Sequence, residues 1–317
     1  MREMKGGGAP KPVRRLRPIV MAVFAVIALG LLVLAAINQG DAFLEAVAGF
    51  EASSIALCIA FGIIATIANS LAWRASMAAL GADLPFAASL RVYFVSQLGK
   101  YVPGSVWPLL AQVELARDAG VPRARSSAGS LLGMVVGATT SAVIGASLLV
   151  LGRPQALVDY WFVLVVVALG ALALTPPVLS WGLRLVSRML RRDSGHLAVR
   201  PGALMASIAW SGVMWLAFGA HMYSLVPAAD LLTATGAYAL AWLAGFVMIL
   251  APAGVGVREG ALVIAFGGVL EPSQALAAAL VSRLVLTLID GAAGGVAFLL
   301  RSRRRPDPRV SGPGTSQ

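Results

Sequence analysis

Long apolar segments separated by short polar stretches run through the chain. They cover residues 18–37, 53–73, 86–98, 126–151, 158–176, 203–226, 231–251, 259–270 and 274–300. Several reach the ~20 residues that an α-helix needs to cross a hydrocarbon core of ~30 Å. They lack the ten-residue alternation that is typical of outer-membrane barrels. The pattern therefore predicts an all-α fold, a polytopic membrane helix bundle.

Two apolar segments, 86–110 and 252–270, are interrupted by proline and glycine and hold basic residues. If both turn back without crossing, seven spans remain and the arginine-rich C-terminus lies outside, against the positive-inside rule. If the second one crosses, both termini are cytoplasmic and the total is eight. We therefore expect about eight spans, and the sequence leaves open whether each broken segment crosses or re-enters.

The two broken segments resemble each other. One reads LGKYVPGSVW and the other ILAPAGVGVREG, with Pro103 and Pro252 at an offset of 149. Further on, Pro122 and Pro272 lie at an offset of 150. This similarity predicts an internal duplication, as in many transporters. The sequence does not decide between an inverted and a parallel repeat.

The charges are few and clustered. Charged residues make up 12% of the chain, against about 25% in soluble domains. The net charge of +11 is concentrated in residues 1–17, 184–200 and 301–317. The positive-inside rule places all three groups in the cytoplasm, and because they flank spans we expect no nucleic-acid partner. The prediction is a multi-pass protein of the cell inner (plasma) membrane, with a transmembrane domain at 18–300 between a basic tail at 1–17 and a basic, disordered tail at 301–317.

The sequence contains few residues that could catalyse a reaction. Cys58 is the only cysteine, His196 lies in a basic interfacial loop, and His221 lies in a span without a carboxylate or second histidine nearby. Nucleophile-elbow, P-loop and metal-binding patterns do not occur. We therefore expect no catalysis, no metal and no cofactor. A stripe of small residues four apart predicts close helix packing, within the bundle or in a homo-oligomer; it comprises Gly129, Gly133, Gly137, Ser141 and Gly145.

Charged residues inside apolar segments are the best candidates for a site, because a charge in the hydrocarbon is costly. Arg283 and Asp290 share one face of the last span,. They form either an ion pair that orients the bundle or part of a substrate site. Arg258 and Glu259 open a helix after a loop in which Gly254 and Gly256 permit tight backbone. A helix N-terminus beside an arginine suits a phosphate, and we expect Glu259 to stabilise the helix start locally.

The stretch GKYVPGSVW follows the same design. The pair Pro103-Gly104 breaks one helix, and a second can begin near Ser105, with Lys100 and Arg91 close by. Non-helical backbone at membrane depth is tolerated only where protein or a water-filled cavity covers it. The alternative is an interfacial loop whose lysine reaches the headgroups.

Three stretches carry a resemblance to a known family: RVYFVSQLGKYVPGSVW at 91–107, APAGVGVREGAL at 251–262 and SRLVLTLIDGAAGG at 282–295. They resemble the flippase-like transmembrane domain of lysylphosphatidylglycerol synthases, from about the second span to Leu300. Ala253 departs from the family pattern, in which glycine is commoner. Full-length synthases carry a soluble C-terminal domain that attaches lysine to lipid; since residue 317 ends a short tail, we expect a stand-alone member without synthase activity.

The resemblance implies a flippase for an anionic lipid, either a phospholipid or a polyprenyl-phosphate sugar. Lys100, Arg258 and Arg283 are then expected to bind the phosphate, helped by the backbone at 103–105 and 253–257. Tyr101 and Trp107 would flank the headgroup, and Asp290 and Glu259 would hold the cations or couple transport to protons. The alternative is a non-transporting membrane partner that presents a lipid-linked intermediate to a cell-envelope glycosyltransferase. Since no ATP-binding motif occurs, transport would be downhill or ion-coupled.

Overall fold

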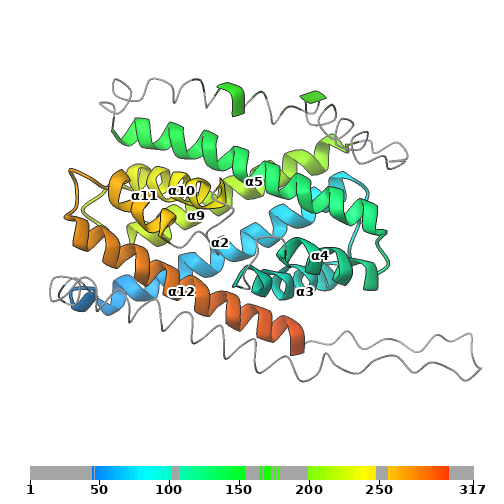
Figure 1. Ribbon diagram of the computed structural model, residues 1–317, viewed down its shortest axis with the longest axis horizontal. Helices are drawn as coiled ribbons and strands as arrows, with labels where there is room; N and C mark the ends of the chain where they lie inside the picture. The colour runs from blue at the N-terminus through cyan, green and yellow to red at the C-terminus, as the bar shows by residue number, and fades with distance from the viewer. Residues whose placement is uncertain are drawn as a thin grey trace, which may run out of the picture.

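The computed structural model describes residues 45, 47–101, 107–153, 199–247 and 256–299, with isolated positions between 165 and 181. These residues form helices and short connections, without a strand (Figure 1). The helices are α2 (Ala52–Ala79), α3 (Phe86–Gln97), the 3₁₀ turn η1 (Leu98–Tyr101), α4 (Trp107–Asp118), α5 (Arg123–Gly152), α9 (Pro201–Tyr223), α10 (Leu231–Val247), α11 (Val257–Ala265) and α12 (Pro272–Leu299). The predicted all-helical class is confirmed.

Four helices, α2, α5, α9 and α12, are long and apolar enough to cross a membrane. They correspond to the segments predicted at 53–73, 126–151, 203–226 and 274–300. The predicted segments 18–37 and 158–176 and both basic tails lie outside the described residues. The count of eight spans therefore stays a prediction for the whole chain.

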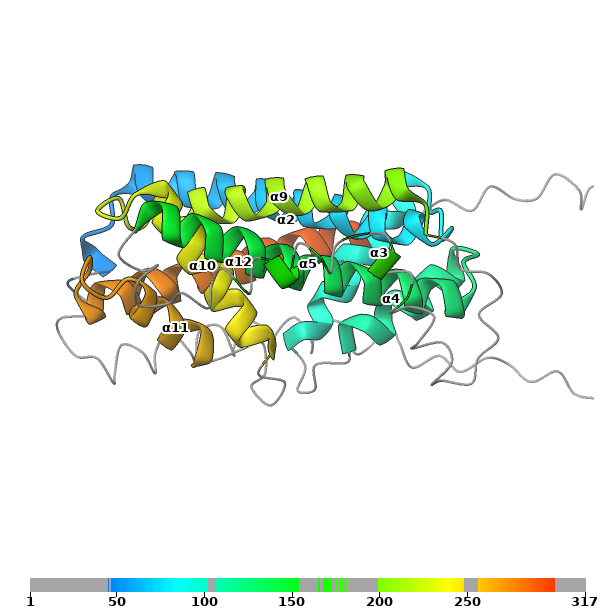
Figure 2. The same ribbon diagram turned by 90° about the horizontal axis from the view of Figure 1, so that it is seen from above.

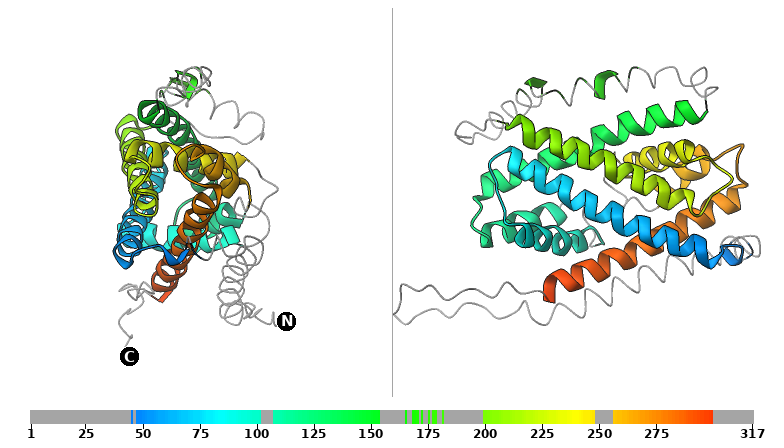
Figure 3. Two further views of the ribbon diagram at one scale, coloured as in Figure 1. Left: turned by 90° about the vertical axis from the view of Figure 1, so that its left-hand side faces the viewer. Right: turned by 180° about the vertical axis from the view of Figure 1, so that it is seen from behind.

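Large apolar side chains face outward, whereas small and polar ones fill much of the interior. On α2, Leu57, Ile64 and Ile67 are about half exposed, while Ser70 and Ser76 are buried. This distribution fits a lipid-facing surface, because helices in a bilayer approach one another through small and hydroxyl-bearing residues. α2 and α9 pack along most of their length and run in opposite directions (Figure 3).

The predicted glycine stripe packs within the bundle. A Cβ on Gly129 would lie 2.7 Å from Met77 Sδ of α2, and one on Gly145 would lie 3.1 Å from Ala239 Cβ of α10. Between them, Ser141 Oγ donates a hydrogen bond of 2.6 Å to the carbonyl oxygen of Ala239. Four members of the stripe therefore serve close packing of α5 against α2 and α10, and for them the helix-packing prediction is confirmed. A Cβ on Gly137 would meet open space among the described residues.

The first broken segment forms a helical hairpin, and the helix of the second forms a hairpin with the helix of the preceding predicted span, 231–251. α3 contacts α4, and α10 contacts α11. With 12 residues in α3 and in α4, 9 in α11 and 17 in α10, these helices span only about 18, 14 and 26 Å, less than the ~30 Å hydrocarbon core. The predicted break at Pro103-Gly104 lies outside the described residues, between η1, which ends at Tyr101, and α4, which begins at Trp107.

The hairpins enter the bundle from opposite ends (Figures 1 and 3). Seen from above, α2 and α9 lie on one side of the bundle and α4 and α11 on the other (Figure 2). α12 contacts both hairpins, through α3 and η1 of the first and through α11 of the second. The tips of the hairpins therefore meet different parts of one helix.

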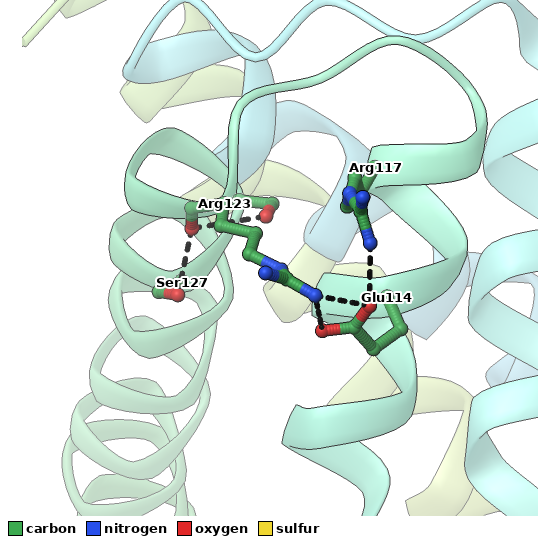
Figure 4. Close-up of polar contacts among 5 residues, drawn as sticks. Glu114, Arg117, Arg123 and Ser127 are labelled. Atoms are coloured by element: carbon green, nitrogen blue, oxygen red, sulfur yellow. Dashed lines mark hydrogen bonds and ion pairs between the residues drawn. The ribbon is translucent and has the colours of Figure 1, made fainter. Parts of the chain in front are cut away.

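Arginines and carboxylates form ion pairs at one end of the bundle. At the end where α2 finishes, Arg200 N–H donates to the carbonyl oxygen of Ala79 at 2.8 Å, and the Arg200 guanidinium pairs with Asp83 at 2.8 Å. At the same end Glu114 of α4 contacts Arg117 and Arg123 (Figure 4). The hydrogen bond from Arg123 lowers the pKa of Glu114 below its usual value.

Candidate functional site

Two charged residues of α12 reach different hairpins. Arg283 and Asp290 lie seven positions apart, so they share one face and are separated by roughly 10 Å along the axis. In the described part of the chain the two do not pair with each other. Asp290 pairs with Lys100, and Arg283 pairs with Glu259. The geometry therefore shows two inter-helix ion pairs, one from each of these residues to a hairpin.

The tip of the first hairpin donates two hydrogen bonds to Asp290. The η1 turn places Lys100 and Tyr101 side by side, with Lys100 Nζ 2.6 Å and the Tyr101 hydroxyl 2.7 Å from Asp290 Oδ2. The Asp290 side chain is 6% exposed and that of Lys100 is 36% exposed. Such a buried carboxylate is stable only when donors compensate for its lost hydration. The tip of this hairpin therefore binds a carboxylate of the protein itself, that of Asp290.

The tip of the second hairpin is built around Glu259. Gly256 is the N-cap of α11 and has φ +83°, a conformation that disfavours other residues,. Its N–H donates to Glu259 Oε2 at 2.7 Å, while Glu259 Oε1 accepts from Arg283 Nη1. The expected helix-start role of Glu259 is confirmed, since its carboxylate supplies the N3 half of a capping box,. The sequence did not indicate that the same carboxylate also binds α12.

Arg258 stands apart from both ion pairs. Its guanidinium carbon lies 4.5 Å from the ring centroid of Tyr238, a cation–π contact,. Among the described residues, Arg258 has no carboxylate within ion-pair distance. Tyr238 is 1% exposed, and its hydroxyl lies near the Ser282 hydroxyl and the Arg258 guanidinium. Tyr238 of α10 therefore lies where α11 and α12 meet.

His221 and Ser282 close the site on the side of α2 and α9. His221 Nδ1 lies 2.7 Å from the carbonyl oxygen of Cys58, and Nε2 lies 2.8 Å from Ser282 Oγ. A carbonyl only accepts, so Nδ1 carries the proton and Nε2 accepts the Ser282 hydroxyl. The pair has the arrangement of a nucleophile and its base, but His221 is 0% and Ser282 1% exposed. The histidine is therefore a satisfied core residue.

Sequence reasoning named some residues that this cluster does not include. Trp107 begins α4 and is 47% exposed; its backbone lies against Gly99, next to Lys100. Arg91 has a buried Nε without a hydrogen-bond partner in the described residues, and no contact joins it to Asp290 or Glu259 there. Pro103, Gly104, Ser105 and Gly254 lie outside the described residues.

Two contributors to the cluster, Tyr238 and Ser282, give no signal in the sequence, because each is a single hydroxyl in an apolar run. Arg74 is a charge inside the second apolar segment. Its guanidinium lies 5.7 Å from the Phe86 ring centroid, at the entrance of the first hairpin.

Comparison with known proteins identifies one family model, described as the lysylphosphatidylglycerol synthase TM region, which matches residues 20–294. The match includes both hairpins and nearly all of α12. No curated protein matches the chain.

Proposed function

The chain belongs to the family of the lysylphosphatidylglycerol synthase transmembrane region, and from this premise we propose that it is a membrane lipid flippase rather than an enzyme. Its substrate is a lipid with a phosphate head, a polyprenyl-phosphate sugar or a phospholipid. The family and the membrane-spanning helices support a lipid-related role in a membrane. The geometry of the hairpin tips supports the finer part of the proposal, the movement of a phosphate-headed lipid between leaflets.

The observation that carries the proposal is that one helix, α12, holds the tips of two hairpins entering from opposite ends. Broken helices whose ends meet inside the bundle are the usual way for a transporter to build a substrate site. Since the Lys100–Asp290 and Arg283–Glu259 pairs each tie one hairpin to α12, either can open while the other stays closed. This arrangement supports alternating access from the two leaflets.

In this proposal Arg258 is the first ligand of the phosphate. It already lies at the N-terminus of α11, where unpaired N–H groups and the helix dipole favour an anion. Lys100 and Arg283 add to the site when their carboxylates move away or take up protons. Tyr101 and the backbone around the hairpin tips complete the contacts with the headgroup.

We also propose that the two halves are an inverted repeat. Each half consists of a long helix, a hairpin and a second long helix: α2 to α5, and α9 to α12. Ala52 and Pro201, which begin the first helices, are 149 positions apart, as are Arg123 and Pro272, which begin the last. The opposite directions of α2 and α9 support an inverted relation (Figure 3).

The comparison of the two halves favours six membrane crossings in place of eight. α2, α5, α9 and α12 supply four, the apolar segments 18–37 and 158–176 supply two, and both hairpins re-enter. The segment 231–251, which was counted as a span in the sequence, becomes the first arm of the second hairpin. Both termini then lie on one side of the membrane. Among the described residues, the end with Ala79 carries Arg117, Arg123, Arg125 and Arg200, whereas the other end carries Arg153. The positive-inside rule supports a cytoplasmic location for the arginine-rich end and both termini.

Reconstitution into liposomes tests the proposed function. Protein-containing vesicles with a fluorescent phosphatidylglycerol or a labelled polyprenyl-phosphate sugar are expected to expose inner-leaflet lipid to an external quencher faster than empty vesicles. Lys100→Ala is expected to slow this movement, whereas the surface variant Glu114→Gln is expected to move lipid at the wild-type rate. Binding without movement in any of these vesicles would instead support the non-transporting partner of a glycosyltransferase.

A further inference from the structure

A chain of buried polar groups leads from α2 to Arg258 at the start of α11. It begins at the carbonyl oxygen of Cys58 and passes through His221 of α9, Ser282 of α12 and Tyr238 of α10. Each of these four residues is at most 1% exposed. Bulk water therefore does not reach the chain, and a donor or acceptor that loses its neighbour there keeps the full cost of burial.

The imidazole of His221 is held in one position and one tautomer. A Cβ on Gly62 would lie 3.2 Å from Nδ1, so the ring lies against the backbone of α2 at a glycine. Nδ1 donates to the Cys58 carbonyl oxygen at 2.7 Å, which leaves Nε2 to accept from the Ser282 hydroxyl at 2.8 Å,. The rings of His221 and Tyr238 also meet edge to face, with centroids 6.0 Å apart. Contacts with α2, α10 and α12 therefore fix this side chain.

The Cys58 carbonyl sets the direction of the protons along the chain. Ser282 has one hydroxyl proton, which goes to Nε2 of His221, so its oxygen can only accept from a further neighbour,. The hydroxyl of Tyr238 lies near this oxygen and near the guanidinium of Arg258. With its proton turned towards Ser282, Tyr238 presents the lone pairs of its oxygen to the cation. The opposite direction would point a hydroxyl proton at Arg258.

We propose that His221 is a positioning residue for Arg258, a role that rests on the proposed function. The neutral imidazole orients the Ser282 hydroxyl, and Ser282 orients the hydroxyl of Tyr238. The oxygen and the ring of Tyr238 then hold the guanidinium, whose carbon lies 4.5 Å from the ring centroid. The side chain that meets the phosphate is thus in place before the lipid arrives, which lowers the cost of ordering it on binding. His221 itself touches no part of the substrate.

Two substitutions at His221, one that keeps the acceptor and one that removes it, test this role. In His221→Gln the amide oxygen can replace Nε2 as the acceptor for Ser282, whereas the shorter His221→Asn can reach the Cys58 carbonyl but not Ser282. Titration calorimetry with dihexanoyl phosphatidylglycerol and the purified full-length protein in detergent measures the affinity. We expect His221→Asn to weaken binding about tenfold and His221→Gln less than about threefold.

A double-mutant cycle with Tyr238→Phe separates positioning from a merely structural role. Tyr238→Phe keeps the ring and removes the hydroxyl, so His221 loses its link to Arg258. In this background we expect His221→Asn to weaken binding no more than about twofold. Ser282→Ala interrupts the same chain at another helix and should behave like His221→Asn, so it replaces that variant if the latter does not fold. The positioning role is overturned by an equal effect in both backgrounds, by wild-type affinity in a folded His221→Asn, or by failure of folded His221→Gln to restore binding.

Thermal unfolding without lipid keeps this test apart from that of the proposed function. No hydrogen bond joins His221 directly to Arg258 in the described part of the chain, and substitutions at positions without contact normally have additive effects on stability,. If the polar chain links them, His221→Asn should lower Tm by at least about 1 °C less in Arg258→Ala than in the wild type. Additive effects on Tm overturn the positioning role. Absence of lipid binding by the wild type overturns the proposed function instead.

Discussion

Glu259→Gln is the most informative single substitution, because it removes one negative charge and little else. The glutamine oxygen still accepts the Gly256 N–H, so the N-cap of α11 is retained. Arg283, however, loses the carboxylate that now meets its guanidinium. Both side chains are well buried, at 14% exposure for Arg283 and 9% for Glu259. Removing one partner of a buried ion pair costs about 3–5 kcal/mol, and the retained cap favours the lower value.

Thermal unfolding in detergent, followed by tryptophan fluorescence, measures this cost. Chains of 150–250 residues lose about 2–4 °C of Tm per kcal/mol; because this chain is longer, we expect a fall of roughly 6 °C. The double variant Glu259→Gln/Arg283→Met removes both charges and is expected to recover about half of that fall. At ~2 °C per kcal/mol that recovery is about 1.5 kcal/mol, and it marks the two residues as coupled, since additive effects would deepen the fall.

The control is Glu114→Gln, which breaks the exposed ion pairs with Arg117 and Arg123. Exposed pairs contribute little because water and salt screen them, so we expect no measurable change in Tm. The reasoning is refuted if Glu259→Gln has the same Tm as Glu114→Gln. It is also refuted if the effects of the substitutions at Glu259 and Arg283 on Tm are simply additive. Either result would mean that the pair does not hold the second hairpin to α12.

Two further predictions concern packing and the start of α10. Gly219→Ala places a Cβ 2.8 Å from Thr235 Cα, so thermal unfolding should reveal a loss of about 1–3 kcal/mol. At Gly212 the same substitution meets open space among the described residues and should be neutral or slightly stabilising. Asp230 caps α10 by accepting from Thr233 Oγ1 at 2.6 Å and from backbone N–H groups, so Asp230→Ala should cost about 1 kcal/mol. Burial raises the pKa of Asp230, but these hydrogen bonds outweigh it and lower the pKa below its usual value. This stability is therefore present above pH ~4 and lost as the pH falls further; a pH dependence that persists in Asp230→Asn would contradict the assignment.

The broken helices could be predicted from sequence because proline and glycine act locally. GKYVPGSVW marked the end of α3 and η1, and the glycines before Arg258 marked the start of α11, where Gly256 does adopt a positive φ. The glycine stripe was equally readable, since a spacing of four predicts one helix face. These features depend on a few neighbouring residues and on the geometry of one helix.

The pairing of the charges could not be predicted in the same way. Lys100 and Asp290 are 190 positions apart, and either cation on the tips could have met either carboxylate of the site. Only the path of the two hairpins decides that Asp290 meets the first tip and Arg283 the second. Tyr238 was hidden for a related reason, because its importance comes from Arg258 lying on its ring, a contact between two helices.

The direct test of the central claim is the rate of transbilayer movement of fluorescent phosphatidylglycerol in liposomes containing the wild type, Arg258→Ala or Arg258→Lys. We expect Arg258→Ala to slow the movement at least about tenfold, since it removes a charge-assisted contact with the phosphate. Arg258→Lys should be intermediate, because an ammonium keeps the charge but loses the bidentate geometry. All three proteins should retain the Tm of the wild type to within a few degrees. Movement at the wild-type rate in folded Arg258→Ala would contradict the account.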